Sequence, residues 1–209
     1  MNRIIPSIIA DNFSEVKDKI DQLEGLVPMA QIDIADGVFA PNITWQNPQD
    51  LDEVRGQIKL EAHLMIVNPE IVVRQWFDKV DSVVIHLESS NQIETILDLA
   101  KSIKARIGLA LNMDTPVEDL YPVARAVDFV QLMTIDKLGF YGQPFALSAV
   151  EKIKILHRHL PNLPIQVDGG IDLDIGRQVV EAGAQKLIVG SAFWQADDKE
   201  KIIKEFNQL

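Results

Sequence analysis

Residues 3 to 23, RIIPSIIADNFSEVKDKIDQL, contain an apolar run followed by a segment in which apolar residues recur every three or four positions. The run at 3–9 is rich in isoleucine, which is typical of a buried strand. Asn12 can cap a helix over 12–23, because its side-chain oxygen can accept from a free backbone N–H of the first turn. The stretch therefore predicts a βα unit of a parallel sheet.

The same alternation of a short apolar run and a longer helical pattern repeats to the end of the chain. Strands are predicted at 3–9, 29–34, 58–65, 82–87, 106–111, 129–133, 164–168 and 186–190. Helices are predicted at 12–23, 69–79, 91–104, 144–159, 173–182 and 197–207, with Asn91 as a second capping residue. The helical pattern is weaker after the second and fifth strands.

Eight βα units favour an α/β fold of the closed (β/α)8 type, the TIM barrel. A doubly wound sheet usually has fewer strands and carries a glycine fingerprint after the first, which is absent here. With 209 residues and 47% hydrophobic residues, the chain suits one core, so we expect a single barrel domain over residues 1–209. Such barrels typically have ~250 residues, which implies short loops here.

Composition excludes several classes of function. A formal charge of −11 and a pI near 4.7 argue against binding to nucleic acid or to an anionic membrane surface. No apolar run approaches the ~20 residues of a membrane span, and the start of the chain does not resemble a signal peptide. The absence of cysteine excludes disulfides and thiolate chemistry. A cytoplasmic location is expected.

Polar residues occur at the carboxyl ends of nearly all the predicted strands, where barrel enzymes build their active sites. They are Ser7, Gln31, Asp33, His63, His86, Glu88, Asn112, Thr134, Asp168 and Ser191. Asp33 and Asp168 follow strands on different sides of the barrel, so their carboxylates can face a substrate from opposite directions. One can remove a proton from a carbon while the other delivers a proton to its opposite face. Asp36 precedes Gly37 and is interpreted as a turn residue.

Asp33, His63 and Asp168 together could bind a divalent metal through nitrogen and oxygen ligands. His86 could join them, pack in the core or support His63 from behind. His157 and His159 are predicted on a helix end, away from the site and solvated.

Glycine-containing loops follow the last three strands, at 138–145, 168–171 and 189–194. Glycine allows backbone N–H groups to approach a phosphate closely, and barrel enzymes often bind phosphate after strands seven and eight. These loops predict a phosphorylated small molecule as substrate.

The chain resembles the ribulose-phosphate 3-epimerase family, whose fold is a phosphate-binding (β/α)8 barrel. The resemblance rests on motifs in the family's order, most specifically H-L-M at 63–65, D-G-x-F-x-P-N at 36–42 and V-D-G-G at 167–170. Other matching stretches are IIPSIIADNF, VVIHLES, LGFYGQPF and VGSAFW.

The resemblance implies an isomerase of carbohydrate metabolism, with Asp33 and Asp168 as acid/base catalysts and also as ligands of one divalent ion (Zn, Mn, Fe or Co) beside His63. It further implies a homo-oligomer. The residues that it assigns to the substrate and its phosphate are Ser7, Met65, Met133, Gly139, Phe140, Tyr141, Gly142, Gln143, Gly169, Gly170, Gly190 and Ser191.

Three positions depart from the family pattern. Gln31 replaces the histidine that is the family's fourth metal ligand, and a neutral amide oxygen is a weaker ligand for a transition metal. Without an ion, His63 or Gln31 is expected to donate hydrogen bonds to the reaction intermediate. Ala35 replaces a methionine, and the loop at 134–143 is one residue longer, with Tyr141 at a usual glycine.

The expected reaction is epimerisation at C3 of a ketopentose phosphate, between D-ribulose 5-phosphate and D-xylulose 5-phosphate, through an enediolate. One alternative is an epimerase for another ketose phosphate, such as a hexulose 6-phosphate, with a pocket reshaped by Ala35 and Tyr141. The other is a catalytically impaired barrel that only binds a sugar phosphate. Retention of Asp33, His63 and Asp168 argues against this last alternative, because a pure binder gains little from two carboxylates beside an anionic ligand.

Overall fold

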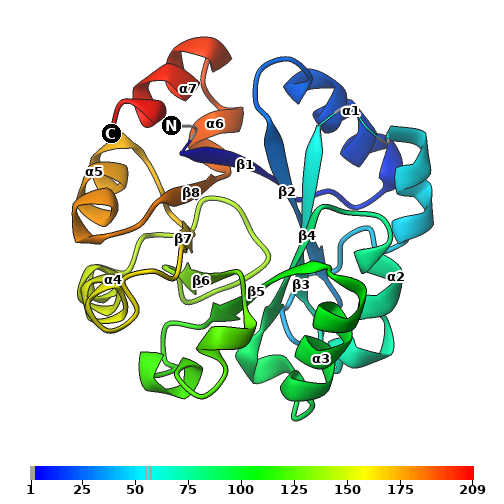
Figure 1. Cartoon of the computed structure of the whole chain (residues 1–209). Coiled ribbons are helices and arrows are strands. Elements are labelled where there is room, and N and C mark those ends of the chain that lie inside the picture. Colours follow the sequence, from blue (N-terminus) through cyan, green and yellow to red (C-terminus); the bar gives the residue numbers. More distant parts are fainter. Residues whose placement is uncertain (1–2, 55, 57) are drawn as a thin grey trace.

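The computed structural model describes residues 3–54, 56 and 58–209, and its centre is a closed barrel of eight parallel strands. The strands follow one another around the barrel in chain order, with β8 paired to β1 (Figure 1). They are β1 (Ile4–Ile8), β2 (Met29–Ala35), β3 (Lys59–Met65), β4 (Ser82–His86), β5 (Arg106–Leu111), β6 (Phe129–Met133), β7 (Ile165–Asp168) and β8 (Lys186–Val189). The predicted (β/α)8 barrel is confirmed.

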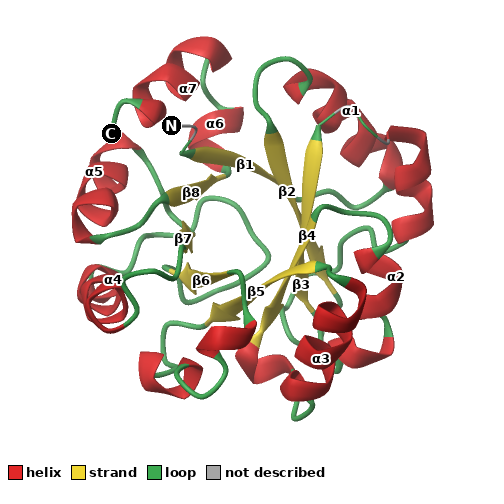
Figure 2. Ribbon diagram, in the orientation of Figure 1, coloured by secondary structure: helices red, strands yellow, loops and turns green. Residues whose placement is uncertain are grey.

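Helices surround this ring of strands (Figure 2). The α-helices are α1 (Phe13–Leu23), α2 (Val73–Phe77), α3 (Ile93–Ile103), α4 (Ser148–His159), α5 (Leu173–Ala182), α6 (Ser191–Trp194) and α7 (Lys199–Asn207). Short 3-10 helices are η1 (Pro48–Val54), η2 (Pro69–Ile71), η3 (Leu87–Ser89), η4 (Val117–Leu120) and η5 (Ala124–Ala126). Among the described residues, β2 and β5 are followed by 3-10 helices and not by an α-helix, and these are the places where the sequence pattern is weakest.

Two helix predictions need correction. The helix predicted over 69–79 is broken into η2 and α2, which begins at Val73 after the left-handed Asn68 and a run of branched residues. Asn91 does not cap α3, which begins at Ile93 after Gln92. The prediction for Asn12 is correct, since its side chain accepts from the N–H of Glu15.

Strand register places inward-facing side chains at two heights in the barrel. Gln31 of β2 is level with Glu61 of β3, and two residues further along, Asp33 is level with His63. On the other side, Gln131 and Gln166 are level, as are Met133 and Asp168. Because side chains alternate along a strand, these two pairs of strands each present polar groups at both heights.

Apolar side chains fill the space outside and below these polar levels. The main core lies between the strands and the helices and includes the fully buried Trp76, Phe193 and Phe206. Inside the barrel, Phe129 packs with Val84 and Ala110, and its ring occupies the space that a side chain at Gly108 would need. None of the helices in the described ranges is both long and apolar enough to cross a membrane.

Candidate active site

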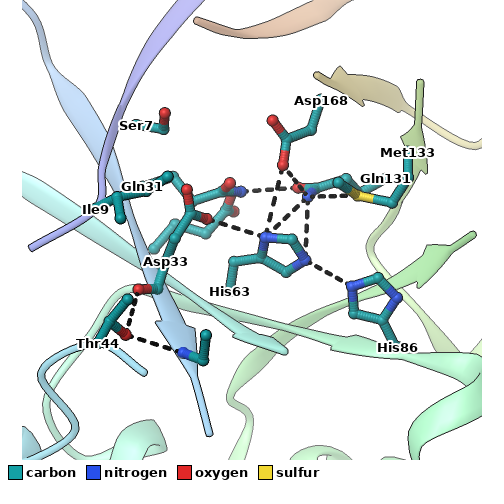
Figure 3. Close-up of polar contacts among 12 residues, drawn as sticks. Ser7, Ile9, Gln31, Asp33, Thr44, His63, His86, Gln131, Met133 and Asp168 are labelled. Atoms are coloured by element: carbon teal, nitrogen blue, oxygen red, sulfur yellow. Dashed lines mark hydrogen bonds and ion pairs between the residues drawn. The ribbon is translucent and has the colours of Figure 1, made fainter. Parts of the chain in front are cut away.

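Asp33, His63 and Asp168 lie together at the carboxyl ends of β2, β3 and β7 (Figure 3). His63 Nδ1 is 3.0 Å from Asp33 Oδ1 and 3.6 Å from Asp168 Oδ2. We call these three residues the aspartate–histidine cluster. The sequence prediction that three different strands bring them together is confirmed in geometry.

His86 lies behind His63 and contacts its other ring nitrogen. The two Nε2 atoms are 2.9 Å apart, so one of them donates and the other accepts. Burial lowers the pKa of both imidazoles to about 4, which leaves both rings neutral at pH 7. Glu88 Oε2 is 3.4 Å from His86 Nδ1 and favours a hydrogen on that nitrogen. His63 Nε2 is then the donor to His86, and His63 Nδ1 turns a lone pair toward the two aspartates.

Glu88 is suited to this role because it remains ionised. Burial alone would raise its pKa, but hydrogen bonds from His86, Thr115 and the backbone N–H of Asn112 outweigh that effect and lower the pKa to about 2. His86 thus supports His63 from behind, as one of the predicted alternatives states, and is not one of the three clustered ligands.

Both aspartates bind a proton more tightly than an exposed carboxyl does. Burial, together with the nearby charge of Glu61, raises the pKa of Asp33 to about 8. Burial, Asp33 and Glu61 raise the pKa of Asp168 in the same way. At neutral pH at least one carboxyl of the pair therefore stays protonated and can act as the acid, and the other is the base in the fraction of molecules in which it is ionised.

Below the cluster lies a second polar level, the glutamine layer, formed by Gln31, Gln131 and Gln166 with Glu61 and Ser82. Glu61 is buried and accepts from Gln31 Nε2 at 2.9 Å, Gln166 Nε2 at 2.8 Å and Ser82 Oγ at 2.7 Å. These three donors stabilise the buried carboxylate of Glu61.

A cavity opens above the cluster on the carboxyl side of the barrel. Asp33 and Asp168 line it, whereas His63 lies beneath and is fully buried. All the residues that the sequence assigns to the substrate also line it, namely Ser7, Met65, Met133, Gly139, Phe140, Tyr141, Gly142, Gln143, Gly169, Gly170, Gly190 and Ser191. The structure thus brings the predicted residues to one cavity, and their roles toward a substrate stay predictions.

Two glycines of the cavity wall are required by their surroundings. Gly170 has a φ of 66°, and a Cβ there would lie 2.7 Å from the backbone nitrogen of Phe145. A Cβ on Gly190 would lie 2.6 Å from the ring of Tyr141. The Tyr141 hydroxyl accepts from Ile9 N at 2.9 Å and donates to Ser7 O at 2.8 Å. Tyr141 therefore fixes the longer loop against β1 and narrows the cavity beside Gly190.

Some predicted residues have other roles. Gln31 is fully buried, and its Nε2 donates to Glu61 and to Gln131, so the prediction that it donates to the intermediate is wrong. Asp36 closes a turn as expected, since Oδ1 accepts from the N–H groups of Val38 and Phe39. On α4, His159 is exposed as predicted, but His157 is half-buried against Gly183.

Comparison with known proteins identifies the family. The model of the "Ribulose-phosphate 3 epimerase family" matches residues 3–194. The chain belongs to this family. Ribulose-phosphate 3-epimerase from Bacillus subtilis is 34% identical to it, with 98% of each chain covered. The chloroplastic enzyme of Arabidopsis thaliana is 35% identical, with 96% of this chain and 74% of the relative covered.

Solved structures support the fold. A crystal structure of 3-hexulose-6-phosphate synthase matches with a TM-score of 0.75 and 16% identity, covering 99% of this chain and 98% of the other. Membership of the epimerase family makes the protein an isomerase, and the family acts on a phosphorylated ketose.

The donor set of this epimerase-family site fits a divalent ion at three positions. One ligand atom from each member of the aspartate–histidine cluster lies within 4.8 Å of the others. The lone pair of His63 Nδ1 also points toward the carboxylates, as a ligand nitrogen should. Gln31 does not complete the set with a strong ligand: its Nε2 donates to Glu61 and Gln131, and its buried Oε1, which has no hydrogen-bond partner among the described residues, is a neutral amide oxygen and a weaker ligand than the imidazole that it replaces.

The sequence analysis missed Glu61, Gln131 and Gln166. Each is a polar residue in an otherwise apolar strand, two positions before a site residue: His63, Met133 and Asp168, respectively. Because side chains two apart in a strand share a face, this spacing could have identified a polar level directly beneath the site.

Proposed function

We propose that the protein interconverts D-ribulose 5-phosphate and D-xylulose 5-phosphate by proton transfer at C3, with Asp33 and Asp168 as the two acid/base groups. The observation that carries this proposal is their placement. The two carboxyls come from β2 and β7, line the same cavity and both have a raised pKa. Membership of the family supports the substrate class.

The proposed reaction needs one ionised and one protonated aspartate. The C2 carbonyl acidifies the C3 proton, which ionised Asp33 removes while the electron pair moves to the carbonyl oxygen. Protonated Asp168 then delivers its proton to the opposite face of C3 as the carbonyl re-forms. The cycle leaves Asp33 protonated and Asp168 ionised, which is the state required for the reverse reaction.

Asp33, His63 and Asp168 would hold the divalent ion that the family implies, with Zn, Mn, Fe and Co as candidates. Such an ion supplies Lewis-acid stabilisation of negative charge on the substrate oxygens. The chain itself contributes exclusion of water, because Met65 and Met133 are buried beside the two aspartates at the floor of the cavity.

The phosphate is assigned to the glycine loops after β6, β7 and β8. Gly142, Gly170, Gly190 and Ser191 line one side of the cavity, where backbone N–H groups can approach phosphate oxygens. The proposal also includes a single barrel domain, a homo-oligomer and a cytoplasmic location. Nucleic acid and membranes are not proposed partners.

A second substrate is favoured by one specific observation. The ring of Tyr141 packs beside Gly190, and Ala35 leaves a smaller side chain next to Met65 and Met133. Tyr141 lines the cavity, and Ala35 packs with two of its lining residues, which suits the alternative that the substrate is another ketose phosphate, such as a hexulose 6-phosphate.

A panel of ketose phosphates tests these proposals. Purified protein would be incubated with D-ribulose 5-phosphate and, separately, with hexulose 6-phosphates, and the C3 epimers would be separated by chromatography. We expect the highest kcat/KM with D-ribulose 5-phosphate. Turnover of a hexulose phosphate alone would transfer the assignment to that substrate. Binding of these sugar phosphates without turnover of any would support the impaired barrel.

A further inference from the structure

Gln131 of β6 connects the glutamine layer to the aspartate–histidine cluster. It is fully buried, and its Oε1 accepts from Gln31 Nε2 and Gln166 Nε2, both at 2.7 Å. Its Nε2 donates upward to Asp168 Oδ2 at 3.1 Å and lies 3.3 Å from His63 Nδ1 (Figure 3). One amide thus contacts two members of the cluster from below.

Glu61 determines the orientation of this amide. A carboxylate only accepts hydrogen bonds, so Gln31 and Gln166 must both turn their NH2 groups toward Glu61 Oε1. The same NH2 groups reach Gln131, which must therefore present its oxygen to them. A flipped Gln131 would place its nitrogen against two donors and lose both hydrogen bonds.

Because of this orientation, Gln131 always presents a donor to Asp168. The Asp168 carboxyl is held with Oδ2 toward the barrel interior, and Figure 3 shows its other oxygen turned away from Gln131. Asp168 lines the cavity, whereas Gln131 is fully buried and does not line it. Gln131 can therefore act on the reaction only through the cluster residues that it contacts, and of these two Asp168 is the one that lines the cavity.

We propose that Gln131 is the positioning residue for Asp168, and that Glu61 sets its orientation through Gln31 and Gln166. This inference rests on the proposed two-aspartate reaction and adds a part that the sequence did not reveal. It also gives Gln31 a role, because the amide that replaces the family's histidine is one of the two groups that orient Gln131.

The test replaces Gln131 by methionine, which has a similar length but no amide. Reactions would be run in D₂O from each of the two epimers. NMR would measure the deuterium incorporated into the remaining starting ketose and the deuterium in the epimer that forms. The first quantity divided by the second is the ratio of return to epimerisation. We expect kcat to fall about tenfold with KM nearly unchanged, because one hydrogen bond to a catalytic carboxyl is lost.

The ratio of return to epimerisation distinguishes a change in the position of Asp168 from a general loss of activity. From the ketose whose proton Asp33 removes, slower delivery by Asp168 raises the ratio. From the other epimer, return through Asp168 is slowed and the ratio falls. Ser82→Ala is the matched control, because it removes a buried hydrogen bond to Glu61 and leaves Gln131 and Asp168 in contact. Its two ratios should equal those of the wild type.

If Gln131→Met does not fold, Gln131→Glu replaces it, since a carboxylate can still accept from Gln31 and Gln166 but presents no donor to Asp168 when ionised. Gln131→Glu should likewise raise the ratio measured from the ketose whose proton Asp33 removes and lower the ratio measured from the other epimer. If the wild type is active and the folded variant has the same two ratios as the wild type, this inference is overturned and the proposed function is not. A wild type that exchanges no C3 proton from either ketose would overturn the proposed function and this inference together.

Discussion

The two polar levels inside the barrel differ in how they satisfy their charges. In the glutamine layer, the single carboxylate of Glu61 accepts from three donors at 2.7 to 2.9 Å. In the aspartate–histidine cluster, two carboxyls lie beside the same nitrogen, Nδ1, of a neutral imidazole, and both have a raised pKa. In the lower level the carboxylate is paired and Gln31 Oε1 is a buried atom without a partner in the described part of the chain, whereas the upper level keeps charges that burial and mutual repulsion disfavour.

This difference teaches how the barrel supports reactive groups. The donors around Glu61 hold the layer in one arrangement, because any displaced donor would leave a buried polar group unpaired. The cluster above it can transfer protons, but its buried carboxyls lower the stability of the protein, as is common at functional sites. Substitutions in the upper level should therefore mainly lower activity, and substitutions in the lower level should mainly lower stability.

The largest effect is expected from removing one proton-transferring group of the upper level. Asp33→Asn and Asp168→Asn should each lower kcat by about 1000-fold, since an amide cannot replace the acid/base group. Circular dichroism should show folded proteins, because asparagine has nearly the same shape as aspartate. Wild-type turnover in either variant would refute the two-aspartate reaction.

Breaking the lower level should mainly affect stability. Glu61→Leu leaves the donors of Gln31, Gln166 and Ser82 without their shared acceptor and should lower the free energy of unfolding by about 3 kcal/mol. Glu61→Gln keeps one acceptor oxygen and should cost about 1 kcal/mol. Urea denaturation would measure both. Equal stability of Glu61→Leu and the wild type would contradict the structural role of the layer.

The pH dependence of stability should reveal the disfavoured charges of the upper level. The pKa of Asp33 is raised to about 8 in the folded protein, so between about pH 4, the ordinary aspartate pKa, and pH 8 the folded state binds more protons than the unfolded state. Stability contributed by this group is lost as pH rises through that window. Asp33→Asn should therefore gain about 3 kcal/mol over the wild type at pH 8 relative to pH 5.

The exposed Asp174, paired with Arg177 at the surface of α5, provides a control. Asp174→Asn should show a much smaller change between pH 5 and pH 8. A stability difference between wild type and Asp33→Asn that does not grow with pH would contradict the raised pKa of Asp33.

The smallest effect is expected at Gln31, in the glutamine layer. Gln31→His introduces a stronger metal ligand and should raise the affinity for Zn²⁺ about tenfold. It should also lose stability, because a neutral imidazole has one N–H and cannot donate to both Glu61 and Gln131. Calorimetric titration of both proteins with Zn²⁺ and Mn²⁺ would measure the affinities. Unchanged or weaker binding would show that Gln31 does not limit the metal site.

The fold was predictable because the alternation of apolar runs and helical patterns is local and repeats eight times. The helix expected over 69–79 failed because Asn68 and the branched residues at 71–73 favour local conformations that the spacing of apolar residues does not reveal. Strand ends likewise identified Asp33, His63 and Asp168, since parallel strands bring their carboxyl ends to one face of a barrel.

The glutamine layer could not be predicted in the same way. Its contacts join residues as far apart as Glu61 and Gln166, and they depend on how strands on opposite sides of the barrel face each other. The role expected for Gln31 failed for the same reason, because its amide is taken by partners on β3 and β6.

The central claim is that two aspartates move protons at C3 of a pentulose phosphate. The most direct measurement follows the C3 proton of D-ribulose 5-phosphate by NMR in D₂O with the wild-type protein, with chelator and with added Mn²⁺ or Zn²⁺. The account predicts deuterium at C3 together with the appearance of D-xylulose 5-phosphate, and loss of both in Asp33→Asn and Asp168→Asn. A C3 proton that does not exchange under any metal condition would contradict it.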